Sequence, residues 1–152
     1  METIEKSVEI LNDLIEINND RIAGFTHAAK DLGDNDSDLT SLFQSFKEES
    51  RQNVQELSTA INQIGGEADF DTSSSGALHR AWLDVKATFT GHDRKSVLAE
   101  CERGEDAIKR AYESALAYDG GLSPEQTPLV LRQQAGIIAA HDKIKALRDS
   151  QA

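Results

Sequence analysis

The sequence predicts an all-α protein, a four-helix bundle, and three observations lead to this fold class. Apolar residues recur every three to four positions along four long segments, the period of a helix with one buried face. Glycines mark the breaks between segments, at positions 33, 65–66, 91 and 120–121. The breaks leave two short links and one long link, and the long link contains an additional short periodic segment.

The first two segments are predicted to be long amphipathic helices. The first covers about residues 3–32, and its apolar stripe consists of Ile4, Val8, Leu11, Ile15, Ile22 and Ala29. The second covers about residues 37–64, with a stripe of Leu39, Leu42, Phe46, Leu57, Ala60 and Ile64, flanked by Phe43 and Ile61. Each has a single apolar face, which favours packing side by side.

The third segment is a short helix at about residues 76–90, which follows a polar, aperiodic loop at 71–76. Its apolar positions are Leu78, Ala81, Trp82, Val85 and Phe89, and Trp82 is interpreted as the anchor that fastens it to the bundle.

The remaining two segments are again long helices. One covers about residues 93–118, with Val97, Leu98, Cys101, Ile108, Tyr112 and Ala115 on its stripe. The last covers about residues 124–148, with Val130, Ile137, Ile138 and Ile144. Its start is ambiguous, because Ser123-Pro124 and Thr127-Pro128 both place a capping residue before a proline.

The lengths of the links predict the topology. Residues 33–36 and 119–122 are too few to join anything but antiparallel neighbours, whereas residues 65–93 can run the length of a bundle. The expected fold is therefore a ferritin-like four-helix bundle with a long crossover that carries a short extra helix. A chain of 152 residues suffices for one such domain, spanning residues 1–152.

Charge and composition narrow the classes of function. The chain has 27 acidic and 16 basic residues, a formal net charge of −11, which argues against nucleic acid or an anionic membrane as partner. No apolar run approaches the ~20 residues of a membrane span. The N-terminal residues Met-Glu-Thr-Ile-Glu predict no signal peptide, and the single cysteine, Cys101, excludes an intrachain disulfide. We therefore expect a cytoplasmic protein.

Polar and ionisable residues interrupt the apolar stripe near the middle of each long helix. They are Asn18 and Asn19, Glu49 and Asn53, Glu105, and Gln134 and His141. Helices that pack side by side bring their midpoints to one level, so these residues are expected to form one buried layer. They either bind a ligand or satisfy each other.

In ferritin-like di-metal proteins, two helices each supply a Glu and the other two each supply Glu-x-x-His. This chain matches that pattern only in part: Asn18, Gln52 and Ile138 stand where ligands are expected. The ligands that remain are Glu49, Glu105 and His141. Losing the others argues against ferroxidase or oxygenase activity, which needs carboxylates able to bridge two irons.

Two interpretations of the layer follow. In one, the amides satisfy the carboxylates and His141 in a buried hydrogen-bond network. Replacing Glu105 by Leu is then neutral or stabilising, provided that its partners can adjust. In the other, Glu49, Glu105 and His141 bind a single divalent ion such as iron, with Asn18, Asn53 and Gln134 as auxiliary amide ligands.

No catalytic residues are predicted elsewhere. Cys101 lies on the apolar stripe without a base or a second thiol nearby, which favours a buried structural cysteine. Glu100 and Glu102 lie about 100° either side of it and point away from each other.

Three stretches resemble the DUF2383 family of small bacterial proteins of unknown function, usually placed in the ferritin-like group. They are residues 76–86 (GALHRAWLDVK), 100–106 (ECERGED) and 141–149 (HDKIKALRD), and the resemblance extends over nearly the whole chain. It implies the bundle fold and leaves the activity open.

The function expected from the sequence is that of a non-enzymatic bundle acting through its surface, as a stress-related or accessory interaction protein or as a homo-oligomer. The alternative is a metal-binding protein with a degenerate site in the bundle core. A third hypothesis is that its acidic faces recruit a basic protein partner.

Overall fold

The computed structural model describes residues 2–32, 36–68, 93–118 and 120–150. These residues form four long helices, α1 (Glu2–Leu32), α2 (Ser37–Gln63), α4 (Arg94–Ala117) and α5 (Thr127–Asp149), and contain no strand. The all-α prediction is confirmed. The short helix expected at 76–90, with Trp82, lies outside the described residues.

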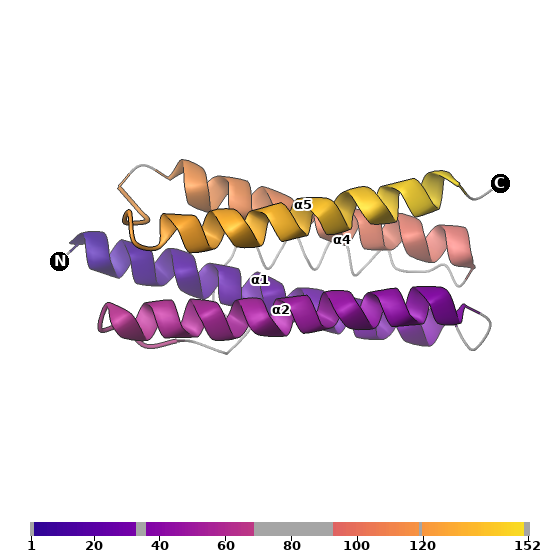
Figure 1. Ribbon diagram of the computed structural model, residues 1–152, viewed down its shortest axis with the longest axis horizontal. Coiled ribbons are helices and arrows are strands. Elements are labelled where there is room, and N and C mark those ends of the chain that lie inside the picture. The colour runs from indigo at the N-terminus through magenta and orange to yellow at the C-terminus, as the bar shows by residue number, and fades with distance from the viewer. Residues whose placement is uncertain (1, 33–35, 69–92, 119, 151–152) are drawn as a thin grey trace.

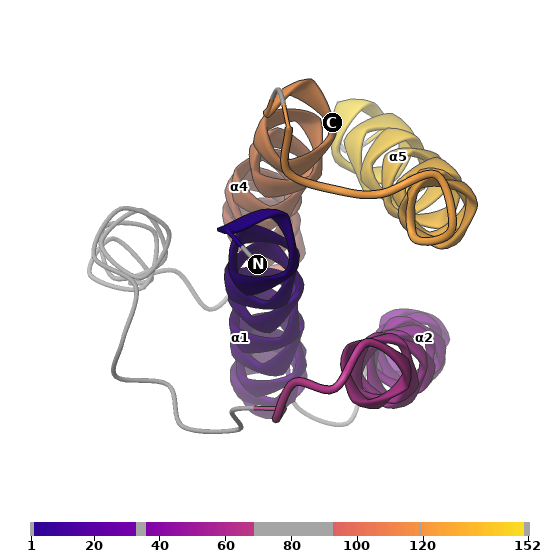
Figure 2. The same ribbon diagram turned by 90° about the vertical axis from the view of Figure 1, so that its left-hand side faces the viewer.

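The helices form two antiparallel pairs, α1 with α2 and α4 with α5 (Figure 1). The pairs meet mainly through α1 and α4, while the backbones of α2 and α5 lie farther apart (Figure 2). α2 ends at the end of the bundle opposite to where α4 begins (Figure 1). This is the ferritin-like connectivity that the link lengths predict.

The last helix begins at Thr127, three residues later than the earlier of the two starts that the sequence offers. Gln126 Oε1 accepts hydrogen bonds from the backbone N–H and the hydroxyl of Ser123, at 2.8 and 2.6 Å. These bonds close a separate turn over residues 123–126, and the Thr127 amide donates to the Ser123 carbonyl at 3.1 Å. Pro128 then lies in the first turn of α5, where its missing N–H costs nothing.

Glycine ends two of the helices as the sequence predicts. Gly65 and Gly120 have φ values of 84° and 76°, a left-handed conformation that side-chain-bearing residues rarely adopt. Gly33 and Gly91 lie outside the described residues.

A polar layer divides the apolar core in two. One cluster contains Leu11, Leu14, Leu57, Ile61 and Tyr112, and the other contains Phe25, Phe43, Phe46, Leu98 and Ile144. Ile4, which the sequence places on the stripe of the first helix, is 49% exposed, because it precedes the first core contacts of α1. None of the described helices combines the length and apolar character needed to cross a bilayer.

Candidate functional site

The centre of the bundle holds a buried arginine, Arg21 of α1, between two carboxylates. Its Nε and Nη2 donate to the two oxygens of Glu105 of α4, at 2.8 and 2.9 Å. Its Nη1 donates to Glu49 Oε1 of α2 at 2.8 Å and to Ser50 Oγ at 3.0 Å. Nη1 also reaches the Phe46 carbonyl, at 3.3 Å. One guanidinium therefore ties three helices together.

The two carboxylates differ in their access to water. The side chains of Arg21 and Glu105 are 3% and 1% exposed, whereas that of Glu49 is 34% exposed. The rings of Phe25 and Phe46 each lie 5.4 Å from the guanidinium carbon, within range of a cation–π attraction. The Arg21–Glu105 pair is thus enclosed, and Glu49 connects it to solvent.

Burial and pairing shift the pKa values of Arg21 and Glu105 in opposite directions. Burial raises the pKa of Glu105 above its ordinary value, and the Arg21 charge and hydrogen bonds oppose that rise. Burial alone would lower the pKa of Arg21, but Glu105 and Glu49 raise it above its ordinary value. The guanidinium therefore remains a permanent cation at the centre of the layer.

An uncharged network adjoins the ion pair. Asn18 Nδ2 donates to the Tyr112 hydroxyl at 2.9 Å, and Asn18 Oδ1 accepts from Ser50 Oγ at 2.8 Å and Asn53 Nδ2 at 3.2 Å. The Tyr112 hydroxyl donates to Gln133 Oε1 of α5 at 2.7 Å. Burial raises the pKa of Tyr112, so the phenol keeps the proton that it donates. All four helices thus contribute to the polar layer.

The structure brings only part of the predicted metal site together. Glu49 and Glu105 meet on Arg21, and Asn18 and Asn53 lie in the adjoining network. His141 instead faces α4, with its Nε2 2.7 Å from Asp106 Oδ1. Gln134 is only half-buried, and the buried amide on α5 is that of its neighbour, Gln133.

Arg21, Ser50 and Gln133 were missed by the sequence reasoning, although the sequence carried a signal for them. Alternating steps of three and four residues define the a and d positions of a heptad, which face the partner helices. Such a pattern on α1 runs through Leu11, Leu14, Asn18, Arg21, Phe25, Ala28 and Leu32, and all of them are buried. Heptad counting therefore places Arg21 in the core, which a stripe drawn at 100° per residue does not.

A second group of ligand-type atoms lies between α4 and α5. One ligand atom each from Glu102, Asp106 and His141 can be chosen so that all three lie within 4.8 Å of one another. Among the described residues, this is the group of His, Cys, Asp and Glu side chains close enough to share a metal ion. None of the three bonds to Arg21, so this cluster is distinct from the central layer.

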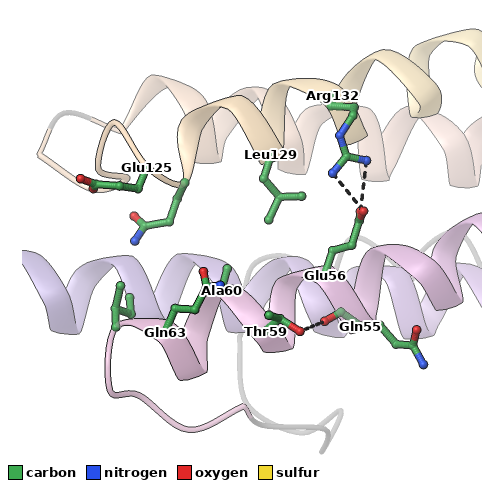
Figure 3. A pocket seen from close by; sticks show the side chains of 10 residues that line it. Gln55, Glu56, Thr59, Ala60, Gln63, Glu125, Leu129 and Arg132 are labelled. Carbon is green, nitrogen blue, oxygen red and sulfur yellow. Dashed lines mark hydrogen bonds and ion pairs between the residues drawn. The ribbon is translucent and has the colours of Figure 1, made fainter.

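The open seam between α2 and α5 forms a groove of about 690 Å³ (Figure 3). Arg132 of α5 reaches across it to Glu56 of α2, with an N–O distance of 2.9 Å. The rest of the lining is amide, hydroxyl and aliphatic, from Gln55, Thr59, Ala60, Gln63, Ile64, Glu125, Gln126 and Leu129. This lining contains no nucleophile paired with a base, so the groove provides no catalytic group of that kind.

Cys101 is buried, as the sequence predicts, with 6% of its surface exposed. Burial, and then the negative charges of Glu105 and Glu100, raise the pKa of its thiol well above the ordinary value. A thiol held in its protonated form is a poor nucleophile, which agrees with a structural role.

Comparisons with known proteins agree with this fold. The model of a family described as a domain of unknown function, DUF2383, matches residues 6–118. No curated protein matches the chain. The solved structure of a Mycobacterium smegmatis Dps1 mutant is similar, with a TM-score of 0.82, 10% sequence identity and 97% of each chain covered. At that identity, the likeness concerns the fold alone.

Proposed function

Because this chain belongs to the DUF2383 family and folds as a ferritin-like bundle, we propose that it is a non-enzymatic bundle protein with a structural central layer. In this proposal, an arginine supplies the positive charge that metal ions supply in ferritin-like di-metal proteins. The protein acts through its surface, as an accessory interaction protein.

The observation that carries this proposal is the pairing of Arg21 with Glu105 and Glu49. Both oxygens of Glu105 and one oxygen of Glu49 accept hydrogen bonds from the guanidinium. Carboxylates that activate oxygen at iron must be free to bridge and shift between ions. Carboxylates held by a buried cation lack that freedom, which supports a structural role.

The surface charge supports a basic partner. With a net charge of −11, long-range electrostatics attract cationic proteins and repel nucleic acid and anionic lipid. A partner recruited in this way associates faster at low salt, because exposed charges more than about 10 Å apart are screened at 0.1 M ionic strength. Self-association is the competing mode of interaction, and it would have to overcome the mutual repulsion of two acidic chains. Sedimentation velocity of the protein at low and high salt tests for self-association. Repulsion between acidic chains makes a homo-oligomer stronger at high salt, whereas a complex with a basic partner becomes weaker.

Ferrous-ion oxidation tests the non-enzymatic part of the proposal. Dioxygen consumption is measured after Fe²⁺ is added to the wild type, to Glu49→Gln and to Glu48→Gln, a matched change at an exposed neighbour on α2. We expect all three to follow the protein-free rate. Oxidation that is accelerated by the wild type and by Glu48→Gln, and abolished in Glu49→Gln, would contradict a structural layer.

The alternative proposal is a divalent-ion site formed by Glu49, Glu105 and His141, and it requires Arg21 to move. Arg21 has to leave the layer before an ion can take its place. A recess of about 230 Å³ is lined by Glu49, the carboxylate through which Arg21 faces solvent, and by Gly136. Elemental analysis of protein purified without chelator tests this alternative. Near-stoichiometric metal that is lost in both Glu49→Gln and His141→Ala would favour it over the arginine-centred layer.

A further inference from the structure

The residues between α4 and α5 form a cluster of two carboxylates and one imidazole that the central layer does not use. Glu102 and Asp106 lie one turn apart on α4, so their side chains emerge on the same face. His141 of α5 faces both, with its Nε2 2.7 Å from Asp106 Oδ1 and 4.0 Å from Glu102 Oε1. The three atoms therefore surround one point.

The imidazole is held in position from its other side. His141 Nδ1 lies 3.1 Å from Asp142 Oδ1, and the His141 side chain is only 9% exposed. Each ring nitrogen thus faces a carboxylate oxygen, and an imidazole nitrogen that bears no proton would repel that oxygen. A carboxylate on the far nitrogen is the arrangement that orients histidine ligands in metal sites.

The neighbouring arginine leaves the cluster available. Arg148 binds Glu102 through Oε2, so Oε1 is the oxygen that faces His141. Asp106 is 38% exposed, which leaves room for water molecules to complete a coordination shell. We propose that Glu102, Asp106 and His141 bind one divalent transition-metal ion, such as Zn²⁺ or Mn²⁺, at the α4–α5 seam.

The ligand chemistry favours these ions over Mg²⁺ and Ca²⁺. An imidazole nitrogen suits Zn²⁺ and other first-row transition metals, while Mg²⁺ and Ca²⁺ prefer oxygen ligands throughout. The two carboxylates balance the charge of a divalent ion. This inference does not rest on the proposed function, because none of its ligands touches Arg21.

Isothermal titration with Zn²⁺ of the metal-free full chain tests the inference. We expect one equivalent to bind to the wild type, and the affinity to fall by at least about tenfold in Asp106→Asn and His141→Gln. Glu113→Gln, which removes an exposed carboxylate from the same helix, is the matched control and should bind like the wild type. Circular dichroism of each variant checks that it is folded, and Asp106→Asn, at a partly exposed position, provides the test if His141→Gln unfolds.

Two results would overturn the inference: no Zn²⁺ binding to the wild type, or equal affinity in folded Asp106→Asn. Glu49→Gln distinguishes the seam from the core. Binding that is weakened in Glu49→Gln and unchanged in Asp106→Asn would place the ion in the central layer, against both this inference and the arginine-centred function. Binding that is weakened only in the seam variants leaves the proposed function untouched.

Discussion

Arg21 is the residue on which the central layer depends. A buried charge is tolerated only when its hydrogen bonds and its charge are both compensated, and here Glu105 and Glu49 compensate both. Removing either partner of a buried pair leaves the other uncompensated, and that penalty exceeds the value of the intact pair. Glu105 depends on Arg21 more than Glu49 does, because the Glu105 side chain is only 1% exposed and cannot turn to water.

The first prediction concerns the cation. Arg21→Met should lower the free energy of unfolding by about 3–5 kcal/mol, because it leaves Glu105 buried without its cation. Arg21→Lys should lose less, since it keeps the charge but not the paired donors that bind both oxygens of Glu105. Urea unfolding followed by circular dichroism measures both changes. A loss below about 1 kcal/mol in Arg21→Met would show that the pair is not enclosed as described.

A second prediction at this scale concerns Asp38, which Arg94 binds at 2.8 Å. Hydrogen bonding from Arg94 lowers the pKa of Asp38 to about 2, against an ordinary value of 3.8. The pairing therefore stabilises the folded protein above pH 3.8. This contribution is lost as the pH falls towards 2, because Asp38 becomes protonated. Carboxyl-carbon NMR titration measures the pKa, and Arg94→Gln should return it towards the ordinary value. An equal pKa in both proteins would contradict the pairing.

At the scale of the helices, the sequence predicted where the helices lie better than which side of each helix faces the core. All four long segments are helical, because their apolar period and their glycine ends act locally. The faces were less well predicted. A stripe at 100° per residue drifts away from the partner helix along a long bundle, whereas the contacts follow the heptad. Arg21 was missed for this reason, whereas Ile4 is 49% exposed because it precedes the first core contacts of α1.

The third prediction concerns the end of α2. Gly65 has a φ of 84°, and a methyl group added there would meet no atom of the described residues within 4 Å. Gly65→Ala therefore tests backbone strain alone, and it should lower the free energy of unfolding by about 1–2 kcal/mol. Thermal and urea unfolding provide the measurement, and Gly120→Ala, with a φ of 76° and equally open surroundings, should behave alike. A neutral Gly65→Ala would show that the turn can adopt another conformation.

For the whole molecule, the sequence predicted the topology and the existence of a polar layer, but not which residues in it pair. Link lengths determine which helices can be antiparallel neighbours, and they are read directly from the glycine breaks. The pairing depends on the rotation of each helix about its axis. Turned towards α4, His141 meets Asp106 instead of Glu105. Such rotations are set by the packing of both apolar clusters together, which no single segment encodes.

The layer also bears on what holds the four helices in register. Apolar side chains above and below it can slide past each other at modest cost, whereas a bidentate Arg21–Glu105 pair forms at one alignment of α1 and α4 only. The sequence predicts that Glu105→Leu is neutral or stabilising if the layer is structural and its partners can adjust. The structure changes that expectation, because Arg21 would lose the fully buried one of the two carboxylates that pair with it among the described residues.

The last prediction is therefore a double-mutant cycle across the layer. Glu105→Leu and Arg21→Leu should each cost about 3–5 kcal/mol, while the double variant should unfold within about 1 kcal/mol of the wild type. Glu49 tolerates the double change because it is 34% exposed and can be solvated. Urea unfolding of the four proteins gives the coupling energy, and amide NMR spectra report whether one alignment persists. If the two losses simply add, the pair is not the element that aligns the helices. A stable double variant with broadened or duplicated resonances would show that the buried charges are retained for register rather than for stability.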